Sequence, residues 1–321
     1  MRSLVIGKFY PPHLGHSYLI DYALSRSDEV VVLVCDSPAY TIPAAKRQQW
    51  LQAIHPTANV QIIPDLDDDD NSKAWAKHTL AFLGYTPDVV FSSENYGTAY
   101  AKYMKTTHHM VDHNRVHIPI SATRIRANLF DEWRYLHPVV KTDLALRIVI
   151  VGAESTGTTT LARDLAAHLD TPWVPEYGRL YSDGFLAVSH QWTSQDFVHI
   201  ASTQQAIEKQ IAHRSNGIIV CDTNASATEI WQKRYMDTAT PDVRAIGAND
   251  KIDLYIITGD EIPFVQDGTR DGKHIRHDMH QSFIQHIKKT NIPYIIALGT
   301  EKARLKQSLQ AVQTFIHYPV S

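Results

Sequence analysis

The stretch Gly7–His16, GKFYPPHLGH, decides the fold of the first half of the chain. Residues 3–6 before it form a short, mostly apolar run that predicts a buried strand, and the apolar spacing of residues 17–24 after it predicts a helix. The turn between them leaves the first backbone N–H groups of the helix unpaired, and such groups attract phosphate. His13 and His16 are three residues apart in the first helical turn, so we expect both imidazoles on one side of it.

Composition limits the class of protein. The chain has 321 residues, of which 44% are hydrophobic and 20% charged, and this length suits two globular domains. A net charge of −3 gives no basic face for nucleic acid. Cys35 and Cys221 each end an apolar run, which predicts two buried thiols, no disulfide framework and a cytoplasmic location. No run approaches the ~18 apolar residues of a membrane span, and we expect neither a membrane partner nor a cleavable leader.

Two α/β domains are predicted from the order of the patterns. Strand and helix patterns alternate in the first half, which is typical of a parallel sheet covered on both faces. The chain restarts at residues 148–151, an apolar run that leads into a glycine-rich loop and a helix over residues 161–169. We place the boundary near residue 143, after Pro138, where proline ends the preceding helical pattern, giving domains 1–142 and 143–321. The other expected elements are strands at 30–34, 60–63, 89–92, 217–220, 254–258 and 294–298 and helices at 44–54 and 74–83.

The first stretch, read as G-x-F-x-P-x-H-x-G-H, resembles the signature of the nucleotidyltransferase superfamily. The resemblance implies a Rossmann-like domain in which the two histidines hold ATP phosphates and stabilise charge during transfer. Residues 120–126, ISATRIR, resemble the superfamily's I-S-x-T-x-x-R motif, whose hydroxyls and arginine bind triphosphate. Class I aminoacyl-tRNA synthetases share H-x-G-H, but their lysine-rich loop is not found here. The residues implied to bind ATP are Gly7, Lys8, Phe9, Gly15 (which lacks a Cβ and lets an anion approach the backbone), Ser121 and Thr123, with His13, His16 and Arg126 catalytic.

Further segments resemble the substrate-contacting parts of nicotinamide-mononucleotide adenylyltransferases. Trp75 is placed to stack on a cationic pyridinium ring, and ordinary core packing explains it equally well. Ser93, Glu94 and Tyr96 follow a predicted strand, at the edge of a parallel sheet where ligands collect. Arg47 matches a position that the family uses for phosphate contact.

Two polar clusters look like metal sites by residue count alone. Asp67–Asp70 is expected to be a solvated loop. His108, His109, His113 and His117 match no ligand pattern, and we expect them on a surface helix or loop.

A phosphate loop opens the second domain. Gly152-x4-Gly157-x-Thr159 follows a predicted strand and begins a helix, as a P-loop does. Thr159 stands where the motif binds Mg²⁺, but the motif's lysine is replaced by Thr158, which cannot supply a cation. Either another cation replaces it, with Arg179, Arg270 and Arg276 as candidates, or the domain binds nucleotide without efficient transfer. The residues expected to hold nucleotide are Gly152, Glu154, Ser155, Thr156, Gly157, Thr158, Thr159, Thr160, Arg270 and Arg276.

Three later segments favour a kinase. Glu176 follows a short strand near residues 173–174, where nucleoside kinases place a carboxylate that accepts the substrate's proton, and Tyr177 and Arg179 beside it are expected to bind substrate. Asp222 ends an apolar strand and resembles the Mg²⁺-organising Walker B aspartate. Whether Glu176 or Asp222 is the base stays open. Residues 263–272, with Arg276 beyond them, resemble a lid.

An H-x-G-H adenylyltransferase joined to a P-loop kinase resembles the NadR-like bifunctional proteins of bacterial NAD synthesis and salvage. The resemblance implies that the second domain phosphorylates ribosylnicotinamide with Mg-ATP. The first domain then joins the mononucleotide to AMP from ATP, releasing pyrophosphate and making NAD. Two alternatives stay open: the first domain acts on another mononucleotide, or the second only senses nucleotide. Homo-oligomers are possible.

Some members of this family carry a helix-turn-helix region ahead of the transferase domain. Because the first predicted strand begins at residue 3, we expect neither that region nor repressor function. Operator binding by the pure protein, weakened by moderate salt as phosphate contacts are, would contradict this expectation.

Overall fold

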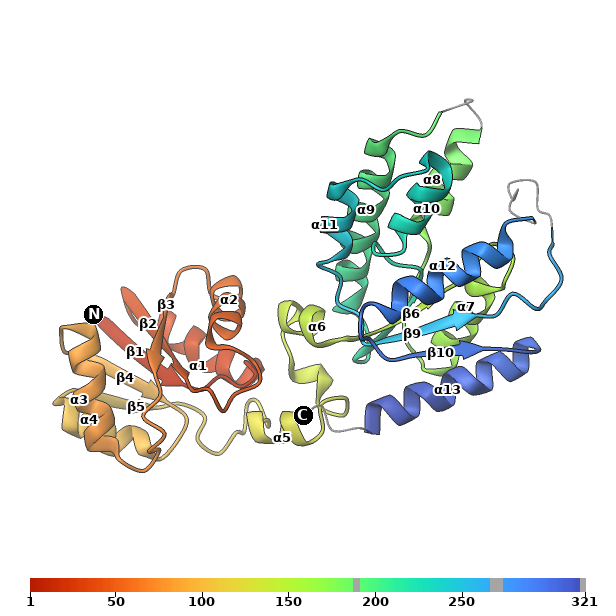
Figure 1. Cartoon of the computed structure of the whole chain (residues 1–321). Coiled ribbons are helices and arrows are strands. Elements are labelled where there is room, and N and C mark those ends of the chain that lie inside the picture. Colours follow the sequence, from red (N-terminus) through yellow and green to blue (C-terminus); the bar gives the residue numbers. More distant parts are fainter. Residues whose placement is uncertain (187–190, 266–273, 318–321) are drawn as a thin grey trace. The chain divides into compact units, whose positions relative to one another are not determined.

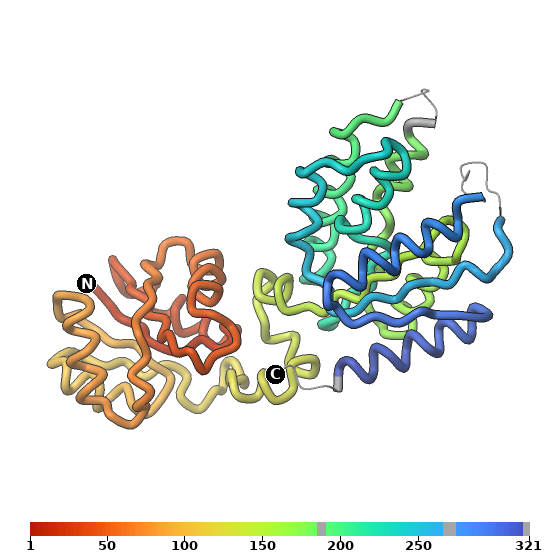
Figure 2. Tube along the Cα trace, viewed as in Figure 1, coloured from red at the N-terminus to blue at the C-terminus, as the bar shows by residue number. Residues whose placement is uncertain are grey.

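A computed structural model describes residues 1–186, 191–265 and 274–317 of the chain. Its internal contacts divide the chain into two compact units, Met1–Asp143 and Leu144–Ser321 (Figures 1 and 2). Each unit is built on a parallel five-stranded sheet. The predicted fold class, two parallel α/β domains, is therefore confirmed.

The first unit has the strand order β3-β2-β1-β4-β5. The first strand, β1, lies at the centre, and its pairing with β2 runs from Arg2 opposite Glu29 to Gly7 opposite Val34. The strands are β1 (Arg2–Gly7), β2 (Glu29–Asp36), β3 (Asn59–Pro64), β4 (Val89–Ser92) and β5 (Thr107–Met110). The helices are α1 (Leu14–Leu24), α2 (Ala44–Ile54), α3 (Ser72–Leu83), α4 (Tyr96–Met104), α5 (Ala122–Ala127), η1 (Trp133–Tyr135) and α6 (Pro138–Leu144).

Alternating side chains of the central strands fill two separate cores. Val32 and Val34 of β2 pack into one apolar cluster, whereas Val31 and Leu33 pack into the other. Successive residues of a strand point to opposite faces, so an uninterrupted apolar run fits a sheet that is covered on both sides. This arrangement places the ends of β1 and β4, and the loops that follow them, at one edge of the sheet.

Two expectations about the first unit are wrong. His108 and His109 lie on strand β5, not on a helix or loop, because the backbone of β5 pairs with β4 although its sequence has no apolar run. Pro138 does not end a helix but begins α6. The first turn of a helix accepts proline because the N–H that proline lacks has no helical partner there.

The second unit has the strand order β10-β9-β6-β8-β7. Its central strand, β6, pairs with β8 and β9, so the loop after β6 lies between the ends of these two neighbours. The strands are β6 (Leu146–Val151), β7 (Trp173–Val174), β8 (Ile218–Asp222), β9 (Leu254–Thr258) and β10 (Tyr294–Ala297). The helices are α7 (Thr158–His168), α8 (Tyr177–Leu186), α9 (Ser194–Ala212), α10 (Thr228–Met236), α11 (Pro241–Gly247), α12 (Arg276–Lys288) and α13 (Glu301–His317).

Both cysteines are buried thiols on strands, as predicted. Cys35 lies on β2 and Cys221 on β8, and neither forms a disulfide. Burial raises the pKa of the Cys35 thiol to about 12 and that of Cys221 well above its ordinary value. Within the described ranges, no helix is long and apolar enough to cross a membrane.

Candidate active sites

The two histidines cap the first turn of α1 together. The N–H of His16 donates to Nδ1 of His13, and the N–H of His13 donates to Nδ1 of His16, each over 3.3 Å. Their rings stack with centroids 3.6 Å apart, so both lie on one side of the turn as predicted. Because each Nδ1 accepts a hydrogen bond, each neutral ring carries its proton on Nε2. The pair can therefore donate two Nε2–H groups to an anion.

Burial keeps both rings neutral. It lowers the pKa of His13 to about 3 and that of His16 well below the ordinary value, and the nearby Arg115 guanidinium adds to both shifts. Gly15 belongs to this arrangement in a different way from the one we predicted. A Cβ at Gly15 would lie 3.0 Å from the His13 ring. The space left by the missing Cβ, where we expected an anion to approach, therefore accommodates that ring.

A cavity of about 160 Å³ brings the two sequence motifs of the first unit together. One wall is the start of α1, and the other is the start of α5. Arg126 of α5 links the two motifs, because its guanidinium donates to the backbone oxygen of Tyr10 over 2.6 Å and to the Thr123 hydroxyl over 3.2 Å. Of the predicted residues, the cavity is lined by His13, Gly15, His16, Ser93, Glu94, Ser121 and Thr123.

Arg115 lines the same cavity, and sequence reasoning missed it. Its guanidinium donates to Glu94 over 2.8 Å, which fixes a cation beside the histidines. No motif surrounds Arg115. The available signal was its place in a polar segment between the last strand and residues 120–126.

Arg47 lies elsewhere, fully buried with 0% of its surface exposed. Its guanidinium donates to the backbone oxygens of Ile42 and Cys35 over 3.0 Å each and to that of Lys8. It therefore joins three segments of the chain. Its Nη2 forms no hydrogen bond among the described residues and lies 3.9 Å from Asp36, so the phosphate contact predicted for Arg47 stays a prediction.

Trp75 and Tyr96 also lie outside the lining of the cavity. Trp75 is 8% exposed within the core, and its Nε1 donates to the backbone oxygen of Asp68 over 3.0 Å, which fits the core-packing alternative. The Tyr96 hydroxyl donates to the oxygen of Ile6 over 2.9 Å, linking α4 to β1.

Lys8 and Phe9 flank the histidines along the chain. Lys8 forms an exposed ion pair with Asp69 over 2.6 Å. Phe9 is buried, and its ring meets His16 edge-on with centroids 4.9 Å apart, so it supports the histidine pair from the core.

In the second unit, the loop after β6 has the shape of an anion nest. Ser155 and Gly157 have φ of 58° and 80°, so left-handed residues alternate along the loop. This alternation turns successive backbone N–H groups toward one side. Gly152 is required by close packing, because a Cβ there would lie 2.1 Å from the Thr258 hydroxyl.

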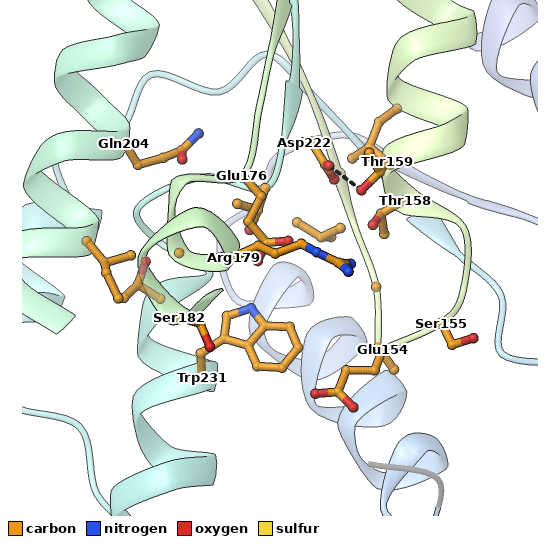
Figure 3. Close-up of a pocket in the computed structure, with 18 of the residues that line it drawn as sticks. Glu154, Ser155, Thr158, Thr159, Glu176, Arg179, Ser182, Gln204, Asp222 and Trp231 are labelled. Atoms are coloured by element: carbon orange, nitrogen blue, oxygen red, sulfur yellow. Dashed lines mark hydrogen bonds between the residues drawn. The ribbon is translucent and has the colours of Figure 1, made fainter. Parts of the chain in front are cut away.

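Thr159 and Asp222 meet at the start of α7, where the Thr159 hydroxyl donates to Asp222 Oδ2 over 2.6 Å (Figure 3). Asp222 is 2% exposed, and burial raises its pKa despite hydrogen bonds from Thr159 and Thr158. A hydroxyl and a carboxylate oxygen are the hard donors that Mg²⁺ prefers. The pair therefore fits the metal that the P-loop motif implies. No group of three or more His, Cys, Asp or Glu is placed to hold a metal in the part of the chain that the structure describes.

A cavity of about 190 Å³ adjoins the loop. Glu176 and Arg179 line it from the start of α8, and Figure 3 shows Arg179 extending toward the loop. The cavity also has an aromatic lining that sequence reasoning missed, because its residues come from separate segments without a shared motif. These residues are Trp192, Phe197, Trp231 and Tyr235.

The remaining predicted residues of this unit lie around the cavity. Tyr177 bonds His199 over 2.9 Å and does not line it, whereas Thr160, exposed on α7, does. Glu154 lines the cavity and forms an ion pair with Arg234. Thr156 is buried and donates to the oxygen of Ala153 over 2.7 Å. Arg270 lies outside the described residues.

Comparison with known families separates the same two parts. The cytidylyltransferase-like family matches residues 4–128, and the AAA domain family matches residues 147–304. The trifunctional NAD biosynthesis/regulator protein NadR of Escherichia coli K12 is 27% identical over 322 residues, covering 91% of this chain and 78% of that protein. The chain is therefore similar to NadR along most of its length. The chain also matches a nicotinamide-nucleotide adenylyltransferase of Aeropyrum pernix, with 58% identity over 102 residues, 29% of this chain and 59% of that one.

Solved structures share the fold of this chain. A NadR protein in complex with NR superposes with a TM-score of 0.76 at 22% identity, over 98% of this chain and 95% of that one. A NadR protein in complex with NAD and AMP-PNP gives a TM-score of 0.75, also at 22% identity, over 100% and 97%. At this identity the likeness establishes the common fold, with both α/β units included.

Proposed function

We propose that this NadR-like chain is a bifunctional transferase that makes NAD from ribosylnicotinamide in two ATP-dependent steps. The observation that carries the proposal is the cavity of the first unit, where the H-x-G-H turn and the start of α5 face each other. The resemblance to an adenylyltransferase of nicotinamide nucleotide supports the first activity. The complexes of NadR with NR, and with NAD and AMP-PNP, support the substrate class and the use of ATP. The partners in this proposal are small molecules of the cytoplasm.

Adenylyl transfer needs charge stabilisation and little else. An oxygen of the mononucleotide phosphate attacks the α-phosphorus of ATP, the new P–O bond forms in line with the breaking α–β bond, and pyrophosphate leaves. The neutral His13 and His16 donate their Nε2–H groups to phosphate oxygens, and Arg126 supplies a cation that Tyr10 holds in place. Such fixed donors act without a covalent intermediate.

For the kinase, the geometry supports different roles for two carboxylates, one in metal binding and one as the base. Asp222 is bonded to Thr159, and together they would hold Mg²⁺, which would supply positive charge to neutralise the phosphates of ATP. Glu176 lines the cavity at the start of α8. We therefore assign Glu176 as the base that accepts the proton of the ribose hydroxyl when this oxygen attacks the γ-phosphorus, the bond from that phosphorus to the β–γ bridging oxygen breaks and ADP leaves.

The aromatic lining supports a flat, cationic substrate. Trp192 and Tyr235 stack with ring centroids 5.3 Å apart, and Trp231 lines the same cavity. The negative face of an aromatic ring attracts a cation, and the Arg234 guanidinium already lies 5.6 and 4.9 Å from the ring centroids of Trp231 and Tyr235. The faces of the lining that Arg234 does not cover would suit a pyridinium ring. A positively charged base is the property that separates ribosylnicotinamide from ordinary nucleosides in this proposal.

Two incubations with Mg-ATP test the proposal. Ribosylnicotinamide alone should give mononucleotide and NAD, and the mononucleotide alone should give NAD and pyrophosphate. NAD from the mononucleotide only would contradict the kinase and favour a nucleotide sensor in the second unit. No NAD from either, with turnover of a different mononucleotide, would contradict the assigned substrate.

A further inference from the structure

Two buried arginines hold the phosphate loop from the side of its carbonyl oxygens. Arg276, at the start of α12, donates to the backbone oxygen of Ser155 over 3.1 Å. Arg304, from the first turns of α13, donates to the backbone oxygen of Thr156 over 2.5 Å. They are only 8% and 3% exposed, and neither lines the cavity next to the loop.

Arg304 is fixed by partners on other elements. Its guanidinium donates to the backbone oxygens of Gly259 and Gly299 over 3.0 Å each and to the Glu261 carboxylate over 2.9 Å. These residues follow β9 and β10. Arg276 likewise donates to the oxygen of Ile262 over 2.7 Å. The segments that follow β9 and β10 therefore fix the positions of both guanidinium groups, and these groups in turn hold the phosphate loop by hydrogen bonds.

The carbonyl contacts have a consequence on the other side of the loop. In a trans peptide the C=O and the following N–H point in opposite directions. The oxygens of Ser155 and Thr156 face guanidinium groups, so the N–H groups of Thr156 and Gly157 point away from them, in the nest geometry described above. A charged donor on the oxygen polarises the peptide and makes its N–H a stronger donor to phosphate.

We propose that Arg276 and Arg304 are positioning residues that compensate for the missing P-loop lysine. They act through the peptides of the loop, whereas a P-loop lysine touches the phosphates directly. The inference rests on the proposed function of the second unit as an ATP-dependent kinase. It also explains why Thr158 can stand at the lysine position without loss of the anion site.

The test is a set of full-length variants with and without a restored lysine. Arg276→Gln and Arg304→Gln should each raise the KM for ATP in ribosylnicotinamide phosphorylation by about 10-fold, the scale of one charge-assisted hydrogen bond. Product is counted as mononucleotide plus NAD. Adding Thr158→Lys should recover most of this loss, whereas Thr158→Lys alone should change the KM much less. This non-additivity separates charge compensation from a merely structural role.

Arg147→Gln is the matched control, because Arg147 is also buried, at 5% exposure, and donates to a carbonyl, that of Ala145 over 3.2 Å. It lies at the start of β6, whereas the phosphate loop follows the end of that strand. It should lower the melting temperature without changing the KM for ATP. Adenylyl transfer by the first unit provides a second control and should stay unchanged in every variant.

Failure of this inference differs from failure of the kinase assignment. If the arginine variants fold and keep the wild-type KM, or if Thr158→Lys recovers nothing, the inference is wrong while the kinase stands. If the wild-type chain phosphorylates no ribosylnicotinamide, the kinase assignment is wrong. The inference is then decided by calorimetric titration with Mg-ADP, with His16→Ala present in every variant. The arginine variants should lose affinity for Mg-ADP, and Thr158→Lys should restore it. Should Arg304→Gln fail to fold, Arg276→Gln alone carries the comparison.

Discussion

At the scale of single residues, the histidine pair has two tasks that mutation can separate. His16→Ala should lower the rate of adenylyl transfer by a factor of about 10²–10³, because one donor to the transition state is lost. The loss of one capping bond should lower the stability by only about 1 kcal/mol. Steady-state kinetics and thermal unfolding of the same sample measure both effects. A folded variant with wild-type turnover would remove His16 from the mechanism.

A single buried carboxyl group should make the stability of the second unit sensitive to pH. Glu208 is 4% exposed on α9, and burial raises its pKa to about 8, although Arg147 lies 3.8 Å away and opposes the shift. Between the ordinary pKa and this raised value the folded chain holds more protons than the unfolded chain. The free energy of unfolding of the second unit therefore falls as the pH rises through this window.

Glu208→Gln keeps the shape of the protonated side chain and removes its titration. The variant should gain stability over the wild type as the pH rises toward about 8.5, with little difference near about pH 5. Urea unfolding across this range measures the change. Glu229→Gln is the control, because hydrogen bonding by Lys233 lowers the pKa of Glu229 against the effect of burial, so no alkaline gain is expected. A constant difference at all pH values would contradict the titration of Glu208.

At the scale of elements, the phosphate loop depends on close packing against the neighbouring strand. Gly152→Ala would place a Cβ 2.1 Å from the Thr258 hydroxyl and 2.6 Å from that of Thr156, and it should destabilise the chain by about 1–3 kcal/mol. Gly184→Ala is the matched control, since nothing lies within 4 Å of its Cβ position on α8. That variant should gain up to about 1 kcal/mol. Urea unfolding compares the two, and equal effects would contradict the packing argument.

The elements themselves were largely predictable because their signals are local. The helix Ala44–Ile54 and the strand Val89–Ser92 have the predicted bounds, set by apolar spacing and by neighbouring turn residues. Strand β5 was missed because it is an edge strand, and its sequence Thr-His-His-Met carries no apolar run. Its identity as a strand comes from pairing with β4, a tertiary contact that no short window contains.

The candidate sites were predictable only where a motif recurs. The motif around His13 was enough to find one site, but Arg304 meets the phosphate loop from 148 residues away and belongs to no pattern. The sequence also does not reveal which polar or aromatic side chains are buried. Arg47 and Trp75 have residue types suited to binding ligands, yet both side chains are buried. Which role such a residue takes is decided by the carbonyls and apolar neighbours that folding brings to it.

At the scale of the whole molecule, the two units should work as separable catalysts. His16→Ala, given ribosylnicotinamide and Mg-ATP, should accumulate the mononucleotide. Asp222→Asn should make NAD from added mononucleotide and almost nothing from ribosylnicotinamide, because the carboxylate that accepts from Thr159 loses its charge. Chromatography of both reactions against time distinguishes the steps. Loss of both activities in either variant would contradict separate sites.

The burial of both thiols makes the native chain a convenient starting point for distance measurements. Cys35 and Cys221 are inaccessible, and their raised pKa values keep them protonated, so maleimide reagents should leave them unmodified. A pair of surface cysteines, one introduced into each half, would then react selectively with a fluorescent donor and acceptor. Energy transfer between these dyes would follow the separation of the halves through a full catalytic cycle, without any prior removal of native cysteines.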